Sequence, residues 1–143
     1  MAVQLSFDFN SAPPKPAQTA ETARRLRGRT AFLAGEAAEC RIADDYARRG
    51  YTLLHRRWRG AAGEIDIVLE GAGGLVFVEV KKSRCFDRAL SSLSPRQLAR
   101  IYRAAEEFAG QRPAGSLTDM RLDVALMNER GEVQVMENVA AAY

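Results

Sequence analysis

The sequence predicts an α/β domain in which helices flank a mixed β-sheet, with the element order α-β-β-β-α-β-β. Two apolar, β-branched runs separated by a Gly-rich break predict a hairpin near the middle of the chain. Helical spacing bounded by capping residues predicts one helix before the hairpin and one after it, and alternating residues predict two further strands near the C-terminus. With 143 residues, 47% of them hydrophobic, the chain is long enough for one domain with a core.

Residues 1–22 are predicted to form a flexible N-terminal tail, and residues 23–143 a single domain. Pro13, Pro14 and Pro16 give the tail the composition of a linker, which does not hold regular structure. A run of arginines then precedes the first predicted helix. That helix extends from about Thr30, a suitable N-cap, to Arg49.

The expected buried stripe of this first helix consists of Leu33, Ala37, Cys40, Ala43 and Ala47. Glu36 lies on or beside that stripe. A carboxylate in this position is costly unless it is paired, hydrogen-bonded or bound to a metal ion. The alternative is that Glu36 lies at the edge of the stripe and extends into solvent.

Residues 51–58 are predicted to form a strand. His55 is the only histidine of the chain, which excludes a metal site built from histidines and favours a surface or phosphate-facing role. Trp58 is expected to anchor core packing rather than to stack on a base.

The central hairpin is predicted to turn through a four-residue loop, Gly71–Gly74, which sets Glu70 opposite Leu75. In that register Asp66 faces Glu79 directly. Alternation places a further set of side chains on the same face as these two acids: Glu64 opposite Lys81, with Val68 and Phe77. The other face receives Ile65, Ile67, Val78 and Val80.

Two carboxylates that face each other across a strand pair repel, and a cation between them removes the repulsion. Asp66 and Glu79 are therefore candidate ligands of a hard divalent ion, Mg²⁺ with Mn²⁺ as a substitute. Lys81 adds a positive donor beside Glu79. The alternative is an ordinary solvated face, against which Val68 and Phe77 argue because solvated faces seldom carry such residues in line.

Ser94, Pro95 and Gln97 predict the start of the second helix, with Ser at the N-cap, Pro at the first position and Gln completing a capping box. Gly110 ends it. Its expected apolar face consists of Leu98, Ile101, Tyr102, Ala105, Phe108 and Ala109. Residues 120–127 alternate in polarity and predict a half-buried strand, and residues 132–137 predict the last strand.

The net charge is only +3, but the basic residues are 18 Arg against 3 Lys, and Arg suits bidentate contacts with phosphate. This composition favours an anionic polymer as partner without establishing one. The candidate nucleic-acid-binding residues are Arg24, Arg25, Arg27, Arg29, Arg56, Arg57 and Arg59. Such runs are also common on solvated faces.

Cys40 and Cys85 are far apart and form no metal-binding or redox motif, so we expect free thiols in a reducing compartment. The chain has no apolar run of 18 residues and no signal peptide. We therefore expect a cytoplasmic protein without a membrane partner.

An acidic residue on the first helix, an Asp on the second strand and Glu-x-Lys on the third together resemble the PD-(D/E)xK nuclease superfamily, which has the restriction-endonuclease-like core. More closely, residues 27–135 resemble the YraN family of bacterial proteins. The matching segments are Gly35-Glu36-Ala37-Ala38, Gly63-Glu64-Ile65-Asp66, Val76-Phe77-Val78-Glu79-Val80-Lys81, Pro95-Arg96-Gln97 and Arg121-Leu122-Asp123-Val124. Two departures, Arg96 in place of a more usual Lys and Lys82-Ser83-Arg84 in place of a Thr-Arg pair, leave Asp66, Glu79 and Lys81 untouched.

The resemblance implies a Mg²⁺-dependent endonuclease that hydrolyses phosphodiester bonds in DNA, with branched repair or recombination intermediates as one substrate class. Asp66, Glu79 and Glu36 would then hold the metal, Lys81 would position water or stabilise charge, and Gln97 would lie near the site. Cutting a two-fold junction would favour a homodimer. The alternative is a nucleic-acid-binding module of the same fold that does not cut.

The segment Gln4-Leu5-Ser6-Phe7-Asp8-Phe9 resembles the short peptide by which bacterial polymerases and repair proteins dock on the DNA sliding clamp. Gln4, Leu5, Phe7 and Phe9 would be the partner-binding residues. The alternative is that the three apolar residues of this segment add an edge strand or a flap to the chain's own sheet.

Overall fold

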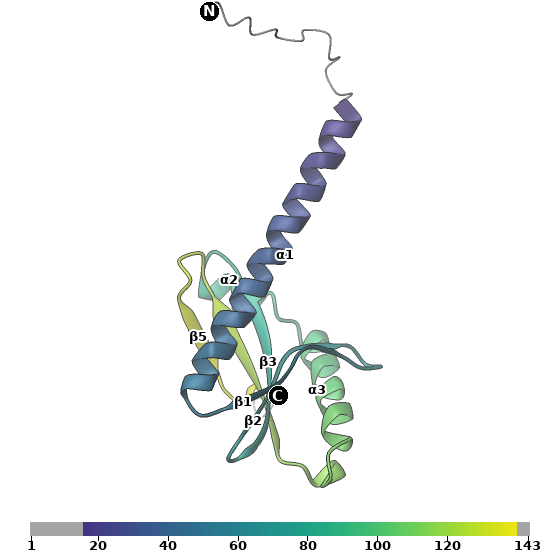
Figure 1. Cartoon of the computed structure of the whole chain (residues 1–143), viewed down its shortest axis with the longest axis vertical. Coiled ribbons are helices and arrows are strands. Elements are labelled where there is room, and N and C mark those ends of the chain that lie inside the picture. The colour runs from purple at the N-terminus through teal and green to yellow at the C-terminus, as the bar shows by residue number, and fades with distance from the viewer. Residues whose placement is uncertain (1–15, 140–143) are drawn as a thin grey trace, which may run out of the picture. The chain divides into compact units, whose positions relative to one another are not determined.

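The computed structural model describes residues 16–139, with side chains from residue 19. Gln4, Leu5, Phe7 and Phe9 lie outside this range, so their role in clamp binding stays a prediction. Figure 1 shows the elements: α1 Pro16–Arg48, β1 Thr52–Arg59, β2 Glu64–Gly71, β3 Gly74–Lys82, α2 Phe86–Ser91, α3 Pro95–Gly110, η1 Gly115–Leu117, β4 Met120–Met127 and β5 Val133–Met136.

Contacts within the chain divide it into two units, with the boundary between Ala34 and Gly35. Residues 16–22, which we expected to lack regular structure, belong to α1. Among residues 16–139 no helix has the length of apolar sequence that crossing a bilayer requires.

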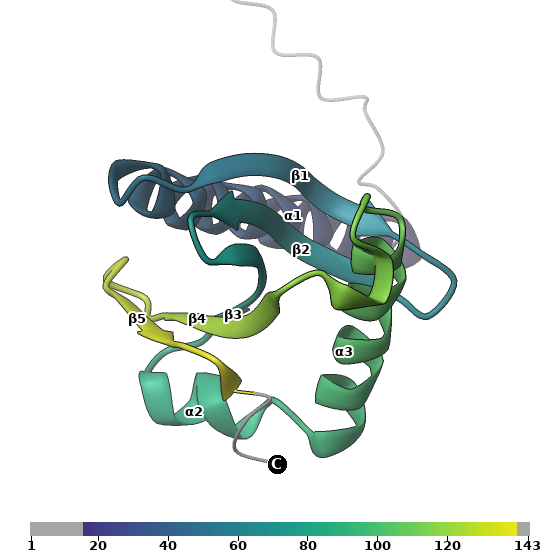
Figure 2. The ribbon, with the colours of Figure 1, turned by 90° about the horizontal axis from the view of Figure 1, so that it is seen from below.

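The five strands form one sheet in the order β1-β2-β3-β4-β5 (Figure 2). β3 and β4 are parallel, and the other three neighbouring pairs are antiparallel. The parallel pair needs a long connection, which α2, α3 and η1 supply. A mixed sheet flanked by helices is therefore confirmed.

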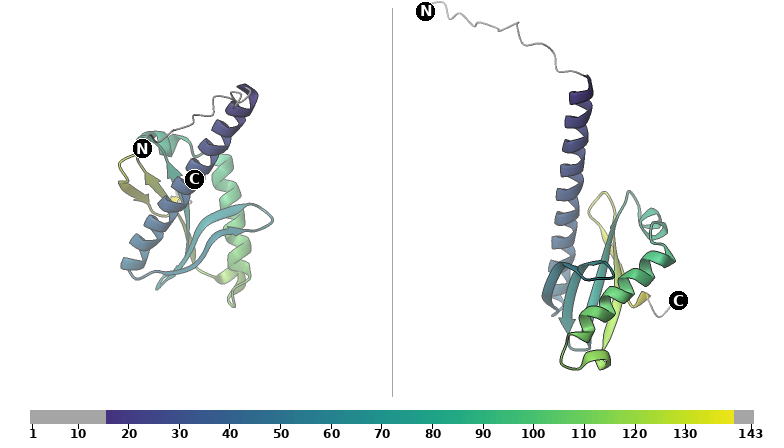
Figure 3. Two further views of the ribbon diagram at one scale, coloured as in Figure 1. Left: turned by 45° about the horizontal axis from the view of Figure 1, so that its top comes forward. Right: turned by 90° about the vertical axis from the view of Figure 1, so that its right-hand side faces the viewer.

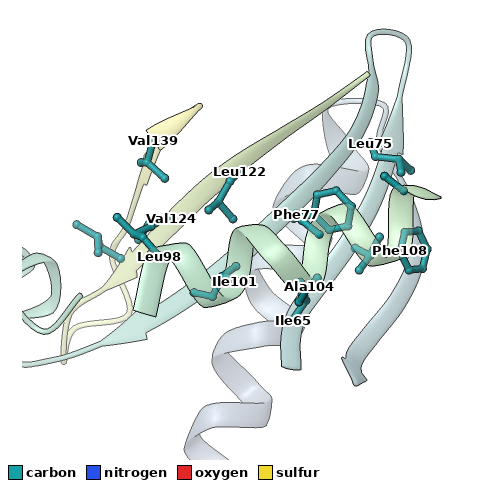
Figure 4. Packing of buried hydrophobic residues seen from close by; sticks show 14 of the residues in the cluster. Ile65, Leu75, Phe77, Leu98, Ile101, Ala104, Phe108, Leu122, Val124 and Val139 are labelled. Atoms are coloured by element: carbon teal, nitrogen blue, oxygen red, sulfur yellow. The ribbon is translucent and has the colours of Figure 1, made fainter. Parts of the chain in front are cut away.

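Figures 2 and 3 show α3 on one face of the sheet and the C-terminal part of α1 on the other, and each face carries one cluster of apolar side chains. On one face, α3 packs on the strands through residues that Figure 4 shows from close by: Leu98, Ile101, Ala104 and Phe108 against Ile65, Phe77, Leu122 and Val124. On the other face, residues 38–46 of α1 pack on Ile67, Leu69, Val76 and Val78. β4 is buried on both faces, so our expectation of a half-buried strand at residues 120–127 was wrong.

The predicted stripe of α1 was wrong except at Ala43, and its predicted start at Thr30 was wrong as well. Leu33 is 51% exposed and Cys40 is exposed. The residues of α1 that enter the core are Ala38, Ile42, Ala43 and Tyr46. Small apolar residues occur on all sides of this helix. The side that packs on the sheet is the one that carries the larger Ile42 and Tyr46, because burying it removes more apolar surface from water.

The second predicted helix is confirmed as α3. Its N-cap Ser94 accepts a hydrogen bond from the backbone N–H of Gln97 at 3.1 Å, and Pro95 is its first residue. Within its apolar face, Ala104 is buried where we expected Tyr102, which is 39% exposed. The element order omitted the short helix α2, whose six residues are too few for a helical period to be recognised.

The register of the central hairpin is confirmed from Ile67 opposite Val78 to Glu70 opposite Leu75. The ladder continues to Gly71 and Gly74, so the turn is shorter than the predicted loop. Ile65 lies in the cluster with Val68 rather than with Ile67. Trp58 packs edge-to-face on Phe108, as expected for a core anchor.

Candidate active site

The two predicted acids lie where regular pairing of β2 with β3 ends. The last pair of the ladder is Ile67 with Val78, and Asp66 and Glu79 are the next residues on each strand. There the Asp66 side chain replaces a backbone acceptor, since its Oδ2 accepts a hydrogen bond from the backbone N–H of Val80 at 2.8 Å. The carboxylate of Asp66 is thereby fixed against β3 and beside Glu79.

Glu79 is buried, with 8% of its surface exposed, and two donors from different elements approach its Oε1. Lys81 Nζ lies 3.5 Å away, and the side-chain amide of Gln97 donates from 3.3 Å. The capping motif therefore uses the backbone of Gln97, while its side chain reaches the acid. The start of α3 is in this way joined to the site.

Burial raises the pKa of Glu79 to about 8, with a further contribution from Asp66, and the Lys81 ammonium opposes this rise. Burial also raises the pKa of Asp66, against the hydrogen bond from Val80. The pair therefore retains a proton at neutral pH in the absence of a cation. A divalent cation satisfies both carboxylates in place of that proton, so this donor set fits Mg²⁺ or Mn²⁺.

Without divalent cations, the free energy of unfolding is expected to fall as pH rises from about 4.5 to about 8. Across this window the unfolded chain has lost the Glu79 proton and the folded chain retains it, so stability decreases by up to ~1.4 kcal/mol per pH unit. Below the window both states are protonated, and above it both are ionised. Urea unfolding in EDTA measures the slope. Glu79→Gln lacks this contribution, and a parallel pH dependence in the two proteins would contradict the expectation.

The acid that α1 brings beside this pair is Glu39 rather than Glu36. Glu39 is buried, with 7% of its surface exposed, and its negative charge contributes to the raised pKa of Asp66. The Glu36 side chain is 43% exposed, and its Oε1 lies 4.0 Å from Nη1 of Arg57. Placing Ala38 on the buried side of α1 would have identified Glu39, because Glu39 is the next residue in the sequence.

Among the described side chains, residues 19–139, no group of three or more His, Cys, Asp or Glu is placed to hold a metal ion. Glu36 therefore does not form a three-carboxylate set with Asp66 and Glu79. The two carboxylates remain a suitable pair, since Mg²⁺ is commonly held by one or two carboxylates, with waters and substrate phosphates completing its coordination.

Glu64 was expected to face Lys81, and the structure places it elsewhere. Its Oε2 lies 3.1 Å from Nη2 of Arg59, in an exposed ion pair. Lys81 instead contacts Glu79. The pairing of β2 with β3 ends at Ile67 and Val78, so the predicted cross-strand pair of Glu64 with Lys81 does not form.

The candidate nucleic-acid-binding arginines fall into two groups. Arg56 and Arg57 contact Glu39, and Arg59 contacts Glu64, so all three are engaged by acids. His55, in the same strand, is exposed and packs on Phe108. The exposed arginines of the other group lie inside α1 rather than before it: Arg24, Arg25, Arg27 and Arg29.

Fold and site together define a mixed α/β protein in which a half-buried Asp, a buried Glu, a lysine and a glutamine gather where β2 and β3 diverge. The chain belongs to the uncharacterised protein family UPF0102, which it matches over residues 38–127. UPF0102 is the YraN family, so the match confirms the resemblance to that family found in the sequence.

Three curated relatives, all UPF0102 proteins, illustrate the match. The protein of Ruegeria pomeroyi is 52% identical over 78% of this chain and 91% of its own length. That of Roseobacter denitrificans is 51% identical over 81% of this chain and 90% of its own length. One from Cereibacter sphaeroides is 44% identical over 82% of this chain and its full length.

Proposed function

We propose that this protein is a divalent-metal-dependent endonuclease that hydrolyses phosphodiester bonds in DNA, including branched repair or recombination intermediates, on a restriction-endonuclease-like core. The observation that carries the proposal is the adjacent pair of the half-buried Asp66 and the buried Glu79, with Lys81 at the carboxylate of Glu79. Two adjacent acids, one buried and one half-buried, destabilise a metal-free fold. A protein that only binds a polyanion gains nothing from them.

Asp66 and Glu79 would hold Mg²⁺, which when bound supplies a Lewis acid for the phosphoryl oxygen and lowers the pKa of water. Gln97 holds the Glu79 carboxylate in place through its amide. The Lys81 side chain is only 19% exposed, and its ammonium would orient the attacking water or stabilise charge that develops on the phosphate.

The second candidate function is a nucleic-acid-binding module of the same fold that does not cut. The exposed arginines of α1 favour it, since affinity for phosphates requires only such a surface. A panel of branched, single-stranded and duplex substrates in Mg²⁺, Mn²⁺ or EDTA separates the two. Cleavage that needs the cation supports the endonuclease, whereas binding without cleavage on every substrate favours the module.

Lys81→Met is expected to lower cleavage roughly a hundredfold or more and to leave nucleic-acid affinity nearly unchanged, because Lys81 acts mainly in the transition state. The comparison uses single-turnover cleavage in Mg²⁺ and binding in EDTA. Lys82→Met is the matched control, since Lys82 is the exposed next residue. Full cleavage by Lys81→Met would remove this residue from the mechanism.

A further inference from the structure

Arg57 has an unusual backbone for a strand residue. It lies inside β1, and its φ of +51° is in the left-handed region. Such a conformation costs free energy in a residue other than Gly, and it persists only where surrounding contacts hold it. Its neighbours Arg56 and Trp58 pair regularly with Ile67 and Ile65. Arg57 is thus the residue of β1 that lies opposite Asp66.

The contact that holds Arg57 is made with the buried Glu39. Nε of Arg57 donates to Glu39 Oε2 at 3.0 Å, and Nη2 of Arg56 donates to the same oxygen at 3.4 Å. The Glu39 side chain is 9% exposed, whereas that of Arg57 is 29% exposed. A guanidinium that solvent reaches is therefore bound to a carboxylate that solvent scarcely reaches.

Two guanidinium groups share the buried Glu39 carboxylate, and Nη1 of Arg57 also lies 4.0 Å from Oε1 of Glu36. Arg56 also donates to the backbone oxygen of Glu36 at 3.4 Å, which keeps it at this place. If Arg57 turns toward another anion, Arg56 still compensates the buried Glu39. Carboxylate and phosphate oxygens offer a guanidinium the same bidentate geometry, so a phosphate can replace Glu39 as the partner of Arg57.

We propose that Arg57 binds a backbone phosphate of the nucleic-acid strand at the Asp66–Glu79 site, and that Glu39 is a positioning residue that occupies Arg57 until the strand arrives. This inference rests on the proposed function, because it assumes a nucleic acid at this site. It assigns to Glu39 a competing role: the acid holds Arg57 in its left-handed conformation and lowers its affinity for phosphate.

The sign of the Glu39→Gln effect tests the proposal. Binding of a fluorescein-labelled DNA junction and of the matching linear duplex is measured by anisotropy in EDTA over a range of salt concentrations. Glu39→Gln is expected to tighten binding several-fold, because the competing charge is removed. Arg57→Gly, which tolerates the positive φ, is expected to weaken binding about tenfold and to reduce the salt slope by about one.

The double variant isolates the coupling between the two residues. In the Arg57→Gly background, Glu39→Gln is expected to have no effect beyond that of a general change in charge. Arg112→Ala is the matched control, since Arg112 forms a comparable ion pair with Glu70 at the other end of β2. Melting temperatures verify that each variant is folded, and Arg57→Lys is expected to recover the salt slope.

Weaker binding by Glu39→Gln, or an equal effect in both backgrounds, would overturn the inference. So would wild-type affinity in Arg57→Gly, and in that case cation-dependent cleavage by the wild-type protein would leave the proposed function standing. Wild-type protein that neither binds nor cuts any substrate would overturn both.

Discussion

Replacing Glu79 with Gln is expected to lower metal-dependent cleavage by ~10³-fold or more and, at the same time, to stabilise the metal-free protein at pH 8. Both effects have one cause. The Glu79 carboxylate is buried next to Asp66, so without a cation its charge costs free energy, which is expressed in its raised pKa of about 8. Gln has nearly the same shape without that charge. Asp66→Asn is expected to behave alike, since its remaining oxygen still accepts from Val80.

Cleavage of the substrate panel and thermal unfolding in EDTA measure these two effects, and calorimetry measures the affinity of each variant for Mn²⁺. Glu64→Gln is the control: it removes a carboxylate two residues from Asp66, but one that is exposed and paired with Arg59. Equal Mn²⁺ affinity in wild type and in both site variants would rule out the metal site. Loss of affinity together with lowered stability would indicate a structural role for the pair.

The second large effect is expected at Asp123, a completely buried acid of β4. Its carboxylate accepts three hydrogen bonds: from the Tyr46 hydroxyl at 2.7 Å, from Nε of Arg121 at 3.1 Å and from the backbone N–H of Asn138 at 2.9 Å. Burial, with Asp123 beside it, raises the pKa of Tyr46, so the hydroxyl stays a donor. Asp123→Ala removes this acceptor from the buried Tyr46 hydroxyl, the half-buried Arg121 and the Asn138 backbone, and is expected to cost ~3–5 kcal/mol of stability.

Urea unfolding of Asp123→Ala, Asp123→Asn and Tyr46→Phe is expected to show the largest loss for Ala and the smallest for Phe, which removes one hydroxyl and leaves Arg121 paired. Well below the melting temperature, Mn²⁺ affinity is expected to be unchanged, because these residues lie in a network separate from Asp66 and Glu79. Reduced affinity in folded Tyr46→Phe would show that the network also supports the site.

The segment Arg121-Leu122-Asp123-Val124 contributed to the family resemblance, and the structure gives it a structural role. Arg121 pairs with Asp123 and donates to the Tyr51 hydroxyl at 3.0 Å, while Leu122 and Val124 enter the core. A polar residue in an alternating strand predicts a solvated face from sequence. Here α1 covers that face, and its Tyr46 supplies the partner.

Local signals determined a large part of this protein. Ser94 and Pro95 fixed the start of α3, and strand alternation with a Gly-rich turn fixed the hairpin register that brings Asp66 to Glu79. Each of these features depends on residues close in sequence, through capping geometry or through the two-residue period of a strand. The candidate acids and Lys81 were therefore predictable without any knowledge of the rest of the fold.

Only the tertiary structure decided which side of α1 is buried, and with it the choice of Glu39 over Glu36. Apolar and small residues occur on every side of this helix, so its own sequence favours no single side for burial. Packing on the sheet buries the side that carries Ile42 and Tyr46. The left-handed backbone conformation of Arg57 could not be predicted from the sequence either. The Glu39 carboxylate that binds its guanidinium lies on α1, 18 residues away in the chain.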